Sequence, residues 1–385
     1  MKGHAEIVGA GLAGLATAIA LAQDGWTVRV HEAGPELREF GAGLYVWENG
    51  LRVLGALGVL DELRERAHQV PMFDVLDERF RLVQRLSFSG AAGDRLFIVP
   101  RPELHRALMN RAIELGADLI TSSKVISATP EGEIELADGT KHRADLVVGA
   151  DGVNSVVRTS LGLLKRKRPL LDGAIRLMIP RTPSERDDPS RQSCVEYWNG
   201  SRRILYTPTS PEHIYLCFTT RASDEEAHRL PLDLDLWKRD FPQLTDELSR
   251  IDSETAVRWD RFTMVKVHAW SKGRSAIVGD AVHAQPPNLG QGAGLAMSTG
   301  LALAWAMRSA DDVLSGLAAW EKAERDIVAH TQRWTWLWGL SSAAFPPQTP
   351  RIRSSFVRWV AHRSWVTANV ERTARHAPTG TLAAD

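Results

Sequence analysis

The residues whose types and spacing most directly indicate a chemistry lie near the N-terminus. Gly9, Gly11 and Gly14 follow a short apolar run in the pattern Gly-x-Gly-x-x-Gly. The first glycine permits a sharp turn, the second lets backbone N–H groups approach a pyrophosphate, and the third lets a helix pack closely on a sheet. Glu32 follows about twenty residues later, where an acid can accept hydrogen bonds from ribose hydroxyls. The pattern predicts a dinucleotide site at a helix N-terminus; a helix packed through glycines without a ligand is the alternative.

The elements that must position these glycines can be read from the apolar periodicity. A short strand precedes Gly9, a helix runs from Leu12 to Gln23, and a second strand runs from Trp26 to His31. Strand, helix and strand in this order predict the start of a doubly wound α/β sheet. From about residue 173 to residue 261 the pattern changes to alternating apolar and polar runs, which predict a separate antiparallel sheet inserted into the α/β domain.

Composition bounds the class of protein. The 385 residues suffice for two domains, and the formal net charge of zero gives no electrostatic indication of a nucleic-acid partner. Cys194 and Cys217 have neither metal-site nor disulfide-framework spacing, so we expect structural thiols and no metal. The first predicted strand begins within about five residues of the N-terminus, leaving no room for a signal peptide. No apolar run reaches the ~18 residues of a membrane span, so a cytoplasmic protein is expected.

Two further motifs follow predicted strands. Asp151 and Gly152 lie in the segment GADGVNSVVR, and Asp280 lies in GDAVHAQPPNLGQG, which continues as a proline- and glycine-rich loop before a long helix. Arg101 opens another helix, where a cation opposes the helix dipole. Such a placement indicates an anionic ligand, although a solvated surface arginine would also explain it.

These three motifs, in this order, resemble those of the class A flavoprotein aromatic hydroxylases, the family of para-hydroxybenzoate and salicylate hydroxylases. The resemblance covers almost the whole chain. It implies an enzyme that binds FAD, uses NADH or NADPH as reductant and hydroxylates an aromatic ring with O₂. The sequence departs from that of many family members after Gly292: residues 293–299 lack the asparagine and the acidic pair that those members carry there.

The resemblance also implies the positions of the cofactor contacts. Glu32 would hold the ADP half of FAD, Asp280 the ribityl chain, and Pro287 would face the isoalloxazine ring. The implied cofactor-binding residues are Gly9, Gly11, Leu12, Ala13, Gly14, Glu32, Ala33, Arg38, Gly43, Arg101, Asp151, Gly152, Asp280, Pro287, Gly290, Gln291, Gly292 and Ala293.

The segments ELREFGAGLYVWENGLRVL, RILYTP and QGAGLAM most resemble a subgroup that oxygenates a hydroxypyridine carboxylate and opens its ring. This implies that Tyr45, Arg203 and Tyr215 contact the substrate, with Pro287 completing the catalytic set. Independently, Arg203 begins an apolar strand, where a buried guanidinium needs an anion such as a substrate carboxylate. Tyr45 and Tyr215 are equally compatible with packed aromatic side chains. Phe73 stands where the subgroup has another substrate-contacting tyrosine, which removes one hydrogen bond.

The expected fold class is therefore α/β, with a Rossmann-like FAD-binding domain, an inserted antiparallel β-sheet substrate domain and a C-terminal helical segment. The expected boundaries are 1–72, 98–172 and 262–330 for the FAD-binding domain, 73–97 and 173–261 for the substrate domain, and 331–385 for the C-terminal helices and a disordered tail.

Three alternatives remain open for the function. A salicylate-, hydroxybenzoate- or 6-hydroxynicotinate-type hydroxylase would act without ring opening, a non-catalytic scaffold could share the fold, and a quinone-pathway hydroxylase would be membrane-bound. The C-terminal segment mixes arginines with Trp334, Trp336, Trp338, Trp359 and Trp365. Such mixtures occur at membrane interfaces and dimer faces, but packing against the core is commoner, so we expect no membrane partner. Whether the chain is a monomer or a homo-oligomer stays open.

Overall fold

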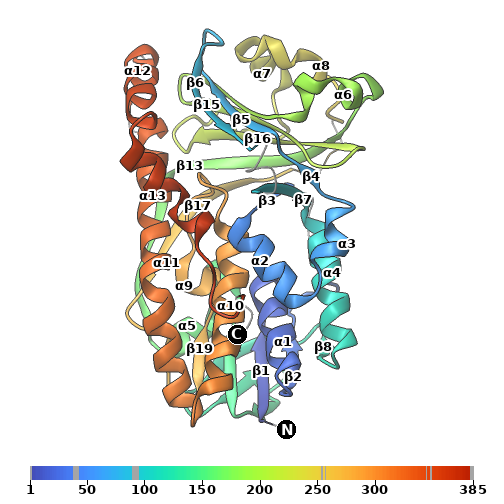
Figure 1. The fold of residues 1–385 in the computed structure, drawn as a ribbon, viewed down its shortest axis with the longest axis vertical. Helices are drawn as coiled ribbons and strands as arrows, with labels where there is room; N and C mark the ends of the chain where they lie inside the picture. The colour runs from blue at the N-terminus through green and yellow to red at the C-terminus, as the bar shows by residue number, and fades with distance from the viewer. Residues whose placement is uncertain are drawn as a thin grey trace.

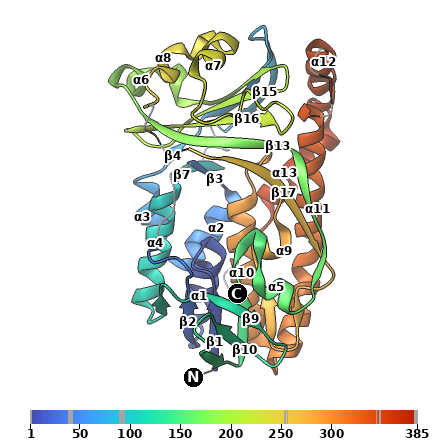
Figure 2. The ribbon, with the colours of Figure 1, turned by 180° about the vertical axis from the view of Figure 1, so that it is seen from behind.

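The computed structural model describes residues 2–37, 43–88, 95–252, 255, 257–343, 345–346 and 349–381. Figure 1 shows two halves stacked along the longest axis, with a parallel sheet and its helices in one half and a larger mixed sheet in the other. C-terminal helices run along one side of the first half, as Figure 2 shows from behind. The predicted α/β fold class, with an inserted sheet and a C-terminal helical segment, is confirmed.

The first half is built on a six-stranded sheet. Across the sheet its strands are β18 (Ser271–Lys272), β19 (Ser275–Ile277), β12 (Leu146–Gly149), β1 (His4–Val8), β2 (Thr27–His31) and β8 (Asp118–Ile120). All neighbours are parallel except β18 at the edge. The central strands read as apolar runs because helices cover both faces of a parallel sheet.

Helix α1 (Leu12–Gln23) has the predicted limits and is buried over most of its length. It packs against α10 (Gly292–Ser309), and small residues allow the two helices to approach closely. At Gly300 an added Cβ would lie 2.3 Å from Thr17 Oγ1. This contact sets the spacing between the N-terminal glycine motif and the helix that follows the last motif.

The second half contains a seven-stranded sheet. Its strands, in order across the sheet, are β17 (Trp259–Val267), β13 (Leu164–Pro180), β16 (His213–Arg221), β15 (Arg202–Pro208), β14 (Cys194–Asn199), β5 (Met72–Leu76) and β6 (Leu82–Ser87). The sheet was expected to be antiparallel, but β5 and β14 pair in parallel because β5 enters from the distant 73–97 segment.

A smaller sheet joins the two halves. It consists of β3 (Gly43–Trp47), β7 (Leu96–Pro100) and β4 (His68–Gln69), paired antiparallel. The segment 73–97, expected to supply substrate-domain strands, therefore divides: β5 and β6 join the large sheet, whereas β7 pairs with β3. β7 is an apolar run with Leu96 to Val99 all buried, which suits a central strand.

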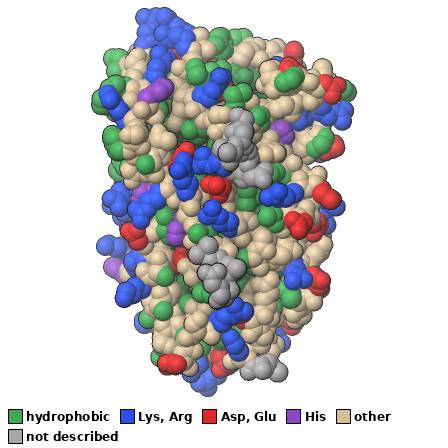
Figure 3. All heavy atoms as spheres, viewed as in Figure 1, with side chains coloured by type: hydrophobic (Ala, Val, Ile, Leu, Met, Phe, Trp, Pro, Cys, Tyr) green, Lys and Arg blue, Asp and Glu red, His purple; other side chains and the backbone are tan. Residues whose placement is uncertain are grey.

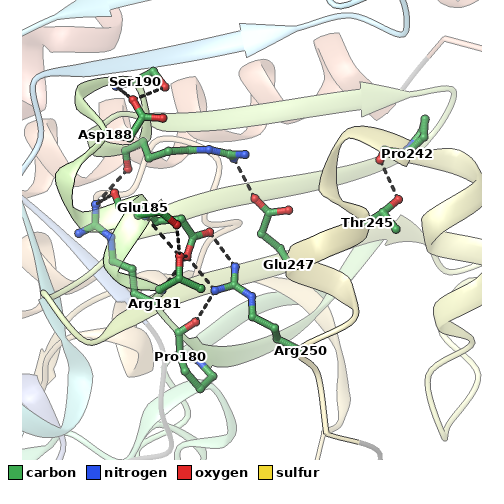
Figure 4. A network of polar contacts seen from close by, with 12 residues as sticks. Pro180, Arg181, Glu185, Asp188, Ser190, Pro242, Thr245, Glu247 and Arg250 are labelled. Atoms are coloured by element: carbon green, nitrogen blue, oxygen red, sulfur yellow. Dashed lines mark hydrogen bonds and ion pairs between the residues drawn. The ribbon is translucent and has the colours of Figure 1, made fainter.

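Short helices cover the far face of the seven-stranded sheet. They are α6 (Pro183–Asp187), α7 (Leu234–Asp240) and α8 (Thr245–Leu248). Arg250 donates to both carboxylate oxygens of Glu185 and to the carbonyl oxygen of Pro180, each at 2.7 Å (Figure 4). This bidentate pair fastens α6 to the segment after α8. The near face is left to meet the first half.

The remaining elements connect these sheets. They are α2 (Glu48–Leu57), α3 (Leu60–Arg64), α4 (Arg101–Glu114), β9 (Val125–Ala128), β10 (Glu133–Leu136), β11 (Lys141–Arg143), α5 (Val156–Ser160), α9 (Asp280–His283), α11 (Val313–Ala343), α12 (Pro350–Ala361) and α13 (Ser364–Arg375). None of the helices in the described part of the chain is long and apolar enough to cross a bilayer.

The expectation of a disordered tail after His376 is wrong for residues 377–381. Thr379 Oγ1 donates to Glu324 Oε1 at 2.7 Å, and Gly380 lies against Leu301 and Trp305. The tail therefore packs on α10 and α11, because a buried carboxylate there needs a hydrogen-bond donor.

Candidate active site

The N-terminal glycines have separate physical roles. Gly9 has a φ of +102°, and its N–H donates to the carbonyl oxygen of His31 at 2.8 Å. A Cβ on Gly14 would lie 2.0 Å from the carbonyl oxygen of Gly9, whereas a Cβ on Gly11 would meet nothing within 4 Å. The fold therefore requires Gly9 and Gly14, while Gly11 borders open space that a pyrophosphate can fill.

Glu32 lies next to these glycines with its carboxylate held by backbone amides. Its Oε2 accepts from the N–H of Ala10 at 3.1 Å and its Oε1 accepts from the N–H of Gly34 at 2.9 Å. A carboxylate offers about four lone-pair sites, so acceptors remain for ribose hydroxyls. Ala33 is exposed beside it.

A buried histidine that the sequence analysis did not identify supports the same loop. His105 on α4 is 4% exposed, and its Nε2 lies 2.8 Å from the carbonyl oxygen of Ala10. Its position on the apolar face of a helix is typical of a core residue, so the sequence pattern gave no signal for this contact.

The second motif is partly structural. Asp151 Oδ2 accepts from the N–H groups of Val156 and Val157 at 2.6 and 3.1 Å, which caps α5. Gly152 has a φ of +75°, and a Cβ there would meet nothing within 4 Å. The aspartate therefore shapes the loop, and the glycine is the part of this motif that borders open space.

Arg158 joins the second motif to the third, and the sequence analysis missed it. Its guanidinium, 2% exposed, donates to the carbonyl oxygens of Ala281 at 2.9 Å and Val153 at 2.8 Å. Burial lowers the pKa of Arg158, and the charge of Asp151 opposes this effect. Ala281 is 123 residues away in the chain and Val153 only five. Only the contact with Ala281 therefore depends on the tertiary structure.

Asp280 lies near enough to Arg101 for the arginine's charge to act on its carboxyl. The Asp280 side chain is exposed, yet desolvation by the surrounding protein raises the pKa of its carboxyl, while the charge of Arg101 lowers it. Gly279, with a φ of +60°, allows this turn to approach α1, where its Cβ would lie 2.6 Å from that of Ala13.

The loop after Asp280 is anchored from α11. Thr335 Oγ1 donates to the carbonyl oxygen of Pro286 at 2.9 Å, and Asn288 Nδ2 donates to the carbonyl oxygen of Thr335 at 3.2 Å. Pro287 between them is exposed. The loop is thus held from behind while Pro287 faces outward, the arrangement that a flat ring above it requires.

The end of this loop packs on β3. Gly290 has a φ of +62°, and its Cβ would lie 2.9 Å from that of Tyr45. Gln291 is buried, and its Oε1 accepts from Asn49 Nδ2 at 3.2 Å, so its side chain makes a contact within the protein. A Cβ on Gly292 would meet nothing within 4 Å, and Ala293 beside it is half-buried. Backbone N–H groups here can therefore face a ligand.

His283 on α9 is fully buried, and its ring nitrogens lack a hydrogen-bond partner among the described residues. Burial lowers the pKa of His283 to about 4. The ring is therefore neutral at physiological pH and packs beneath the loop.

The predicted substrate residues lie on the near face of the seven-stranded sheet or against it. The hydroxyl of Tyr45 lies 2.7 Å from Thr207 Oγ1, and the Phe73 ring meets the Tyr45 ring edge-on at 6.2 Å. Tyr215 is 5% exposed on the strand beside Thr207. Burial raises the pKa values of Tyr45 and Tyr215 well above their ordinary value, so both phenols stay protonated.

Three further residues of the expected cofactor set remain to be placed. Gly43 is buried, and its Cβ would lie 2.6 Å from Thr209 Cγ2, so this glycine serves the packing between the two halves. Arg38 lies outside the described residues. Leu12 is buried in the first turn of α1.

Arg203 already has its counter-charges. It is 6% exposed, and its Nη2 donates to Asp172 Oδ2 at 3.0 Å and its Nη1 to Glu196 Oε1 at 3.1 Å. Thr207 lies four positions further along β15, a distance of roughly 13 Å. The anion that a buried guanidinium needs is supplied by Asp172 on β13 and Glu196 on β14, which the sequence analysis had overlooked.

No group of residues within the described ranges has the composition and geometry to hold a metal ion, and Cys194 and Cys217 are buried free thiols. A Cβ on Gly11, Gly152 or Gly292 would meet nothing within 4 Å, so a ligand can approach the backbone at each of these glycines. Phosphates suit such backbone amides, ribose hydroxyls suit the Glu32 carboxylate, and a flat ring suits the exposed Pro287. The residues present therefore fit FAD.

Comparison with known proteins also indicates an FAD-binding protein. Residues 4–323 match the family described as FAD binding domain. The chain is 41% identical over 330 residues to a probable 2-heptyl-3-hydroxy-4(1H)-quinolone synthase of Rhodococcus erythropolis, covering 86% of each chain. It is 40% identical over 335 residues to a 2-heptyl-3-hydroxy-4(1H)-quinolone synthase of Mycobacteroides abscessus, covering 86% of this chain and 88% of the relative.

Among solved structures, the fold matches the tetrameric form of 2-methyl-3-hydroxypyridine-5-carboxylic acid oxygenase with a TM-score of 0.87 and 36% identity, covering 97% of this chain and 96% of that one. The expected class of enzyme is confirmed, with FAD as cofactor and NADH or NADPH as reductant. The chain belongs to the FAD-binding-domain family and is a flavin-dependent aromatic monooxygenase of class A.

Proposed function

We propose that this enzyme hydroxylates a neutral, oxygenated nitrogen heteroaromatic ring of the 4-quinolone type. The observation that carries the proposal is the neutralisation of Arg203 by Asp172 and Glu196. A substrate carboxylate at that guanidinium would have to displace a buried acid. Arg176, a second arginine of the near face, also lies within reach of an acid, 3.7 Å from Asp260. The names of the relatives at 40 and 41% identity support the same ring class.

The residues assigned to the cofactor would hold it across the first half. Gly11, Gly152 and Gly292 leave room for it, Glu32 accepts from a ribose, and Asp280 accepts from the ribityl hydroxyls. Bound FAD, once reduced, supplies the activation of O₂ for transfer of one oxygen atom to the ring.

The protein's own part is orientation and exclusion of water. The Pro287 loop forms one wall of the substrate space. Tyr45, fixed by Thr207, and Tyr215 form the opposite wall. Because burial keeps both phenols protonated, they can donate to a ring oxygen or accept from a ring N–H without charge transfer.

A second candidate is the ring-opening oxygenation of a hydroxypyridine carboxylate. The structural match to an enzyme named for that substrate favours it, as does the sequence resemblance of the segments that contain Tyr45 and Tyr215. This candidate requires the substrate carboxylate to pair with Arg203. Asp172 and Glu196 already pair with that guanidinium, which counts against it.

The test follows NADH and NADPH oxidation by the FAD-loaded enzyme with both substrate classes and reads product masses. We expect 2-heptyl-4(1H)-quinolone to stimulate oxidation and to gain the mass of one oxygen atom. Stimulation only by 2-methyl-3-hydroxypyridine-5-carboxylate, with a product that gains one oxygen and one water, would replace the first proposal by the second.

A further inference from the structure

Helix α12 presents its three largest apolar side chains to solvent. Ile352, Phe356 and Trp359 recur at i, i+4 and i+7 and are 62, 44 and 59% exposed. The opposite side of the helix, with Arg353, Ser354, Val357 and Ala361, is buried. A surface helix ordinarily turns its apolar stripe toward the core. The stripe on α12, residues Ile352, Phe356 and Trp359, is therefore an apolar face left open, and we call it the α12 stripe.

The aromatic surface continues beyond the helix. Phe356 contacts the ring of Phe345 at 5.6 Å and that of Trp359 at 6.5 Å. A shallow groove of about 500 Å³ runs along the stripe. Trp365, at the start of α13, is also 59% exposed. Packing against the core, the arrangement expected for the C-terminal tryptophans, does not hold for Trp359 and Trp365.

The surroundings of the stripe are basic. Residues 350–375 contain six arginines and one acid, Glu371. Arg351 and Arg363 are exposed and form no ion pair within the described ranges, and the Arg363 guanidinium lies 4.4 Å from the centre of the Trp359 ring. The helix lies at one end of the molecule, where Lys and Arg side chains gather (Figures 1 and 3).

The positive charge around the α12 stripe indicates which kind of partner can cover it. Arg358, Arg372 and Arg375 are paired with Asp77, Asp326 and Glu371. In a twofold dimer built on this face, the stripe would meet its own copy, and Arg351 and Arg363 would bring like charges to the same interface. An anionic bilayer supplies the missing negative charge through its headgroups and an apolar region below them for the stripe. Tryptophan and arginine side chains combine an apolar body with a polar end, which suits the boundary between the headgroups and the apolar region of a bilayer.

We propose that α12 docks this enzyme on the surface of an anionic lipid bilayer, with the α12 stripe in the headgroup–acyl boundary and Arg351 and Arg363 on the headgroups. The contact is peripheral, and no segment crosses the bilayer. It rests on α12 and its surroundings and is independent of the substrate.

The test is co-sedimentation of the FAD-loaded full chain with vesicles of phosphatidylcholine alone or of an equimolar phosphatidylcholine–phosphatidylglycerol mixture. We expect binding to the anionic vesicles that weakens with salt. The double variant I352E/W359E should lose binding on the order of tenfold or more, and Arg351→Gln and Arg363→Gln about fivefold each. The matched control Ile113→Glu alters another exposed isoleucine, 53% against 62% for Ile352, on α4 and should bind as the wild type.

All variants should keep wild-type flavin content and NADH oxidation, because α12 lies outside the proposed site. Failure of the wild type to sediment with anionic vesicles, or unchanged sedimentation of I352E/W359E, would overturn the proposal. A relative occurs in a tetrameric form, so the same series includes gel filtration. Conversion of an oligomer to monomers by I352E/W359E would assign the stripe to a second copy of the chain instead.

Discussion

The substitution Arg203→Ala tests the structural account of the substrate half most directly. It removes a guanidinium whose partners are nearly as buried as itself, with side-chain exposures of 7% for Arg203, 10% for Asp172 and 15% for Glu196. Breaking a buried ion pair by removing one partner costs about 3–5 kcal/mol, because the other charge stays buried without compensation. We expect the free energy of unfolding to fall by that amount, with the KM for a neutral quinolone changed less than about twofold.

The defect should depend on pH. Burial raises the pKa of Asp172, and the charge of Arg203 now opposes that effect. Without Arg203 the pKa of Asp172 rises further above its unfolded value, so the folded state binds more protons than the unfolded state. Stability of the variant is then lost as pH rises, and the defect shrinks as pH falls toward about 5.

Urea unfolding of the holoenzyme at about pH 5 and about pH 8, with steady-state kinetics alongside, measures both effects. The matched control is the triple variant R203M/D172N/E196Q, which removes all three charges and should recover most of the stability. If Arg203→Ala were as stable as the wild type while the KM for a hydroxypyridine carboxylate rose tenfold or more, Arg203 would bind a substrate carboxylate and the reasoning for a neutral ring would fail.

Four further predictions concern the cofactor half. Gly11→Ala adds a Cβ where no protein atom lies within 4 Å, so apoenzyme stability should be unchanged while FAD affinity, measured by flavin fluorescence, falls tenfold or more. Gly14→Ala places a Cβ 2.0 Å from the Gly9 oxygen and should lower the melting temperature of the apoenzyme itself. Arg158→Met leaves the buried carbonyl of Ala281 and the half-buried carbonyl of Val153 without this donor and should cost roughly 3 kcal/mol in urea unfolding, a loss that equal stability would contradict. The pKa of His283, lowered from 6.5 to about 4, means that the folded state binds fewer protons than the unfolded state between these values. Wild-type stability should therefore fall by about 3 kcal/mol as pH drops through this window, and His283→Phe should lack that loss.

The parts of this protein that the sequence by itself determined are those built from neighbours in the chain. The strand–helix–strand unit around Gly9, Gly11, Gly14 and Glu32 follows from local turn geometry and apolar period, and α1 has the predicted limits. The resemblance carried by three ordered motifs was sufficient for the family, the cofactor and the class of reaction.

Only the tertiary structure decided which charges meet. Arg203 was correctly expected to be buried and to need an anion, but Asp172 lies 31 residues away on another strand, and no local pattern shows that it is the partner. The contact between Arg158 and Ala281, 123 residues apart, is of the same kind. Strand order across a sheet sets these distances, and it depends on packing of the whole chain.

The same reason explains α12. Its spacing of Ile352, Phe356 and Trp359 defines a stripe on one side of a helix, but periodicity cannot say which side faces the core. Here the neighbouring elements bury the side with Arg353, Ser354, Val357 and Ala361 and leave the side with the three largest apolar side chains exposed. The sequence shows which residue types lie on each side of α12. Which side faces the core depends on how the rest of the fold packs against the helix.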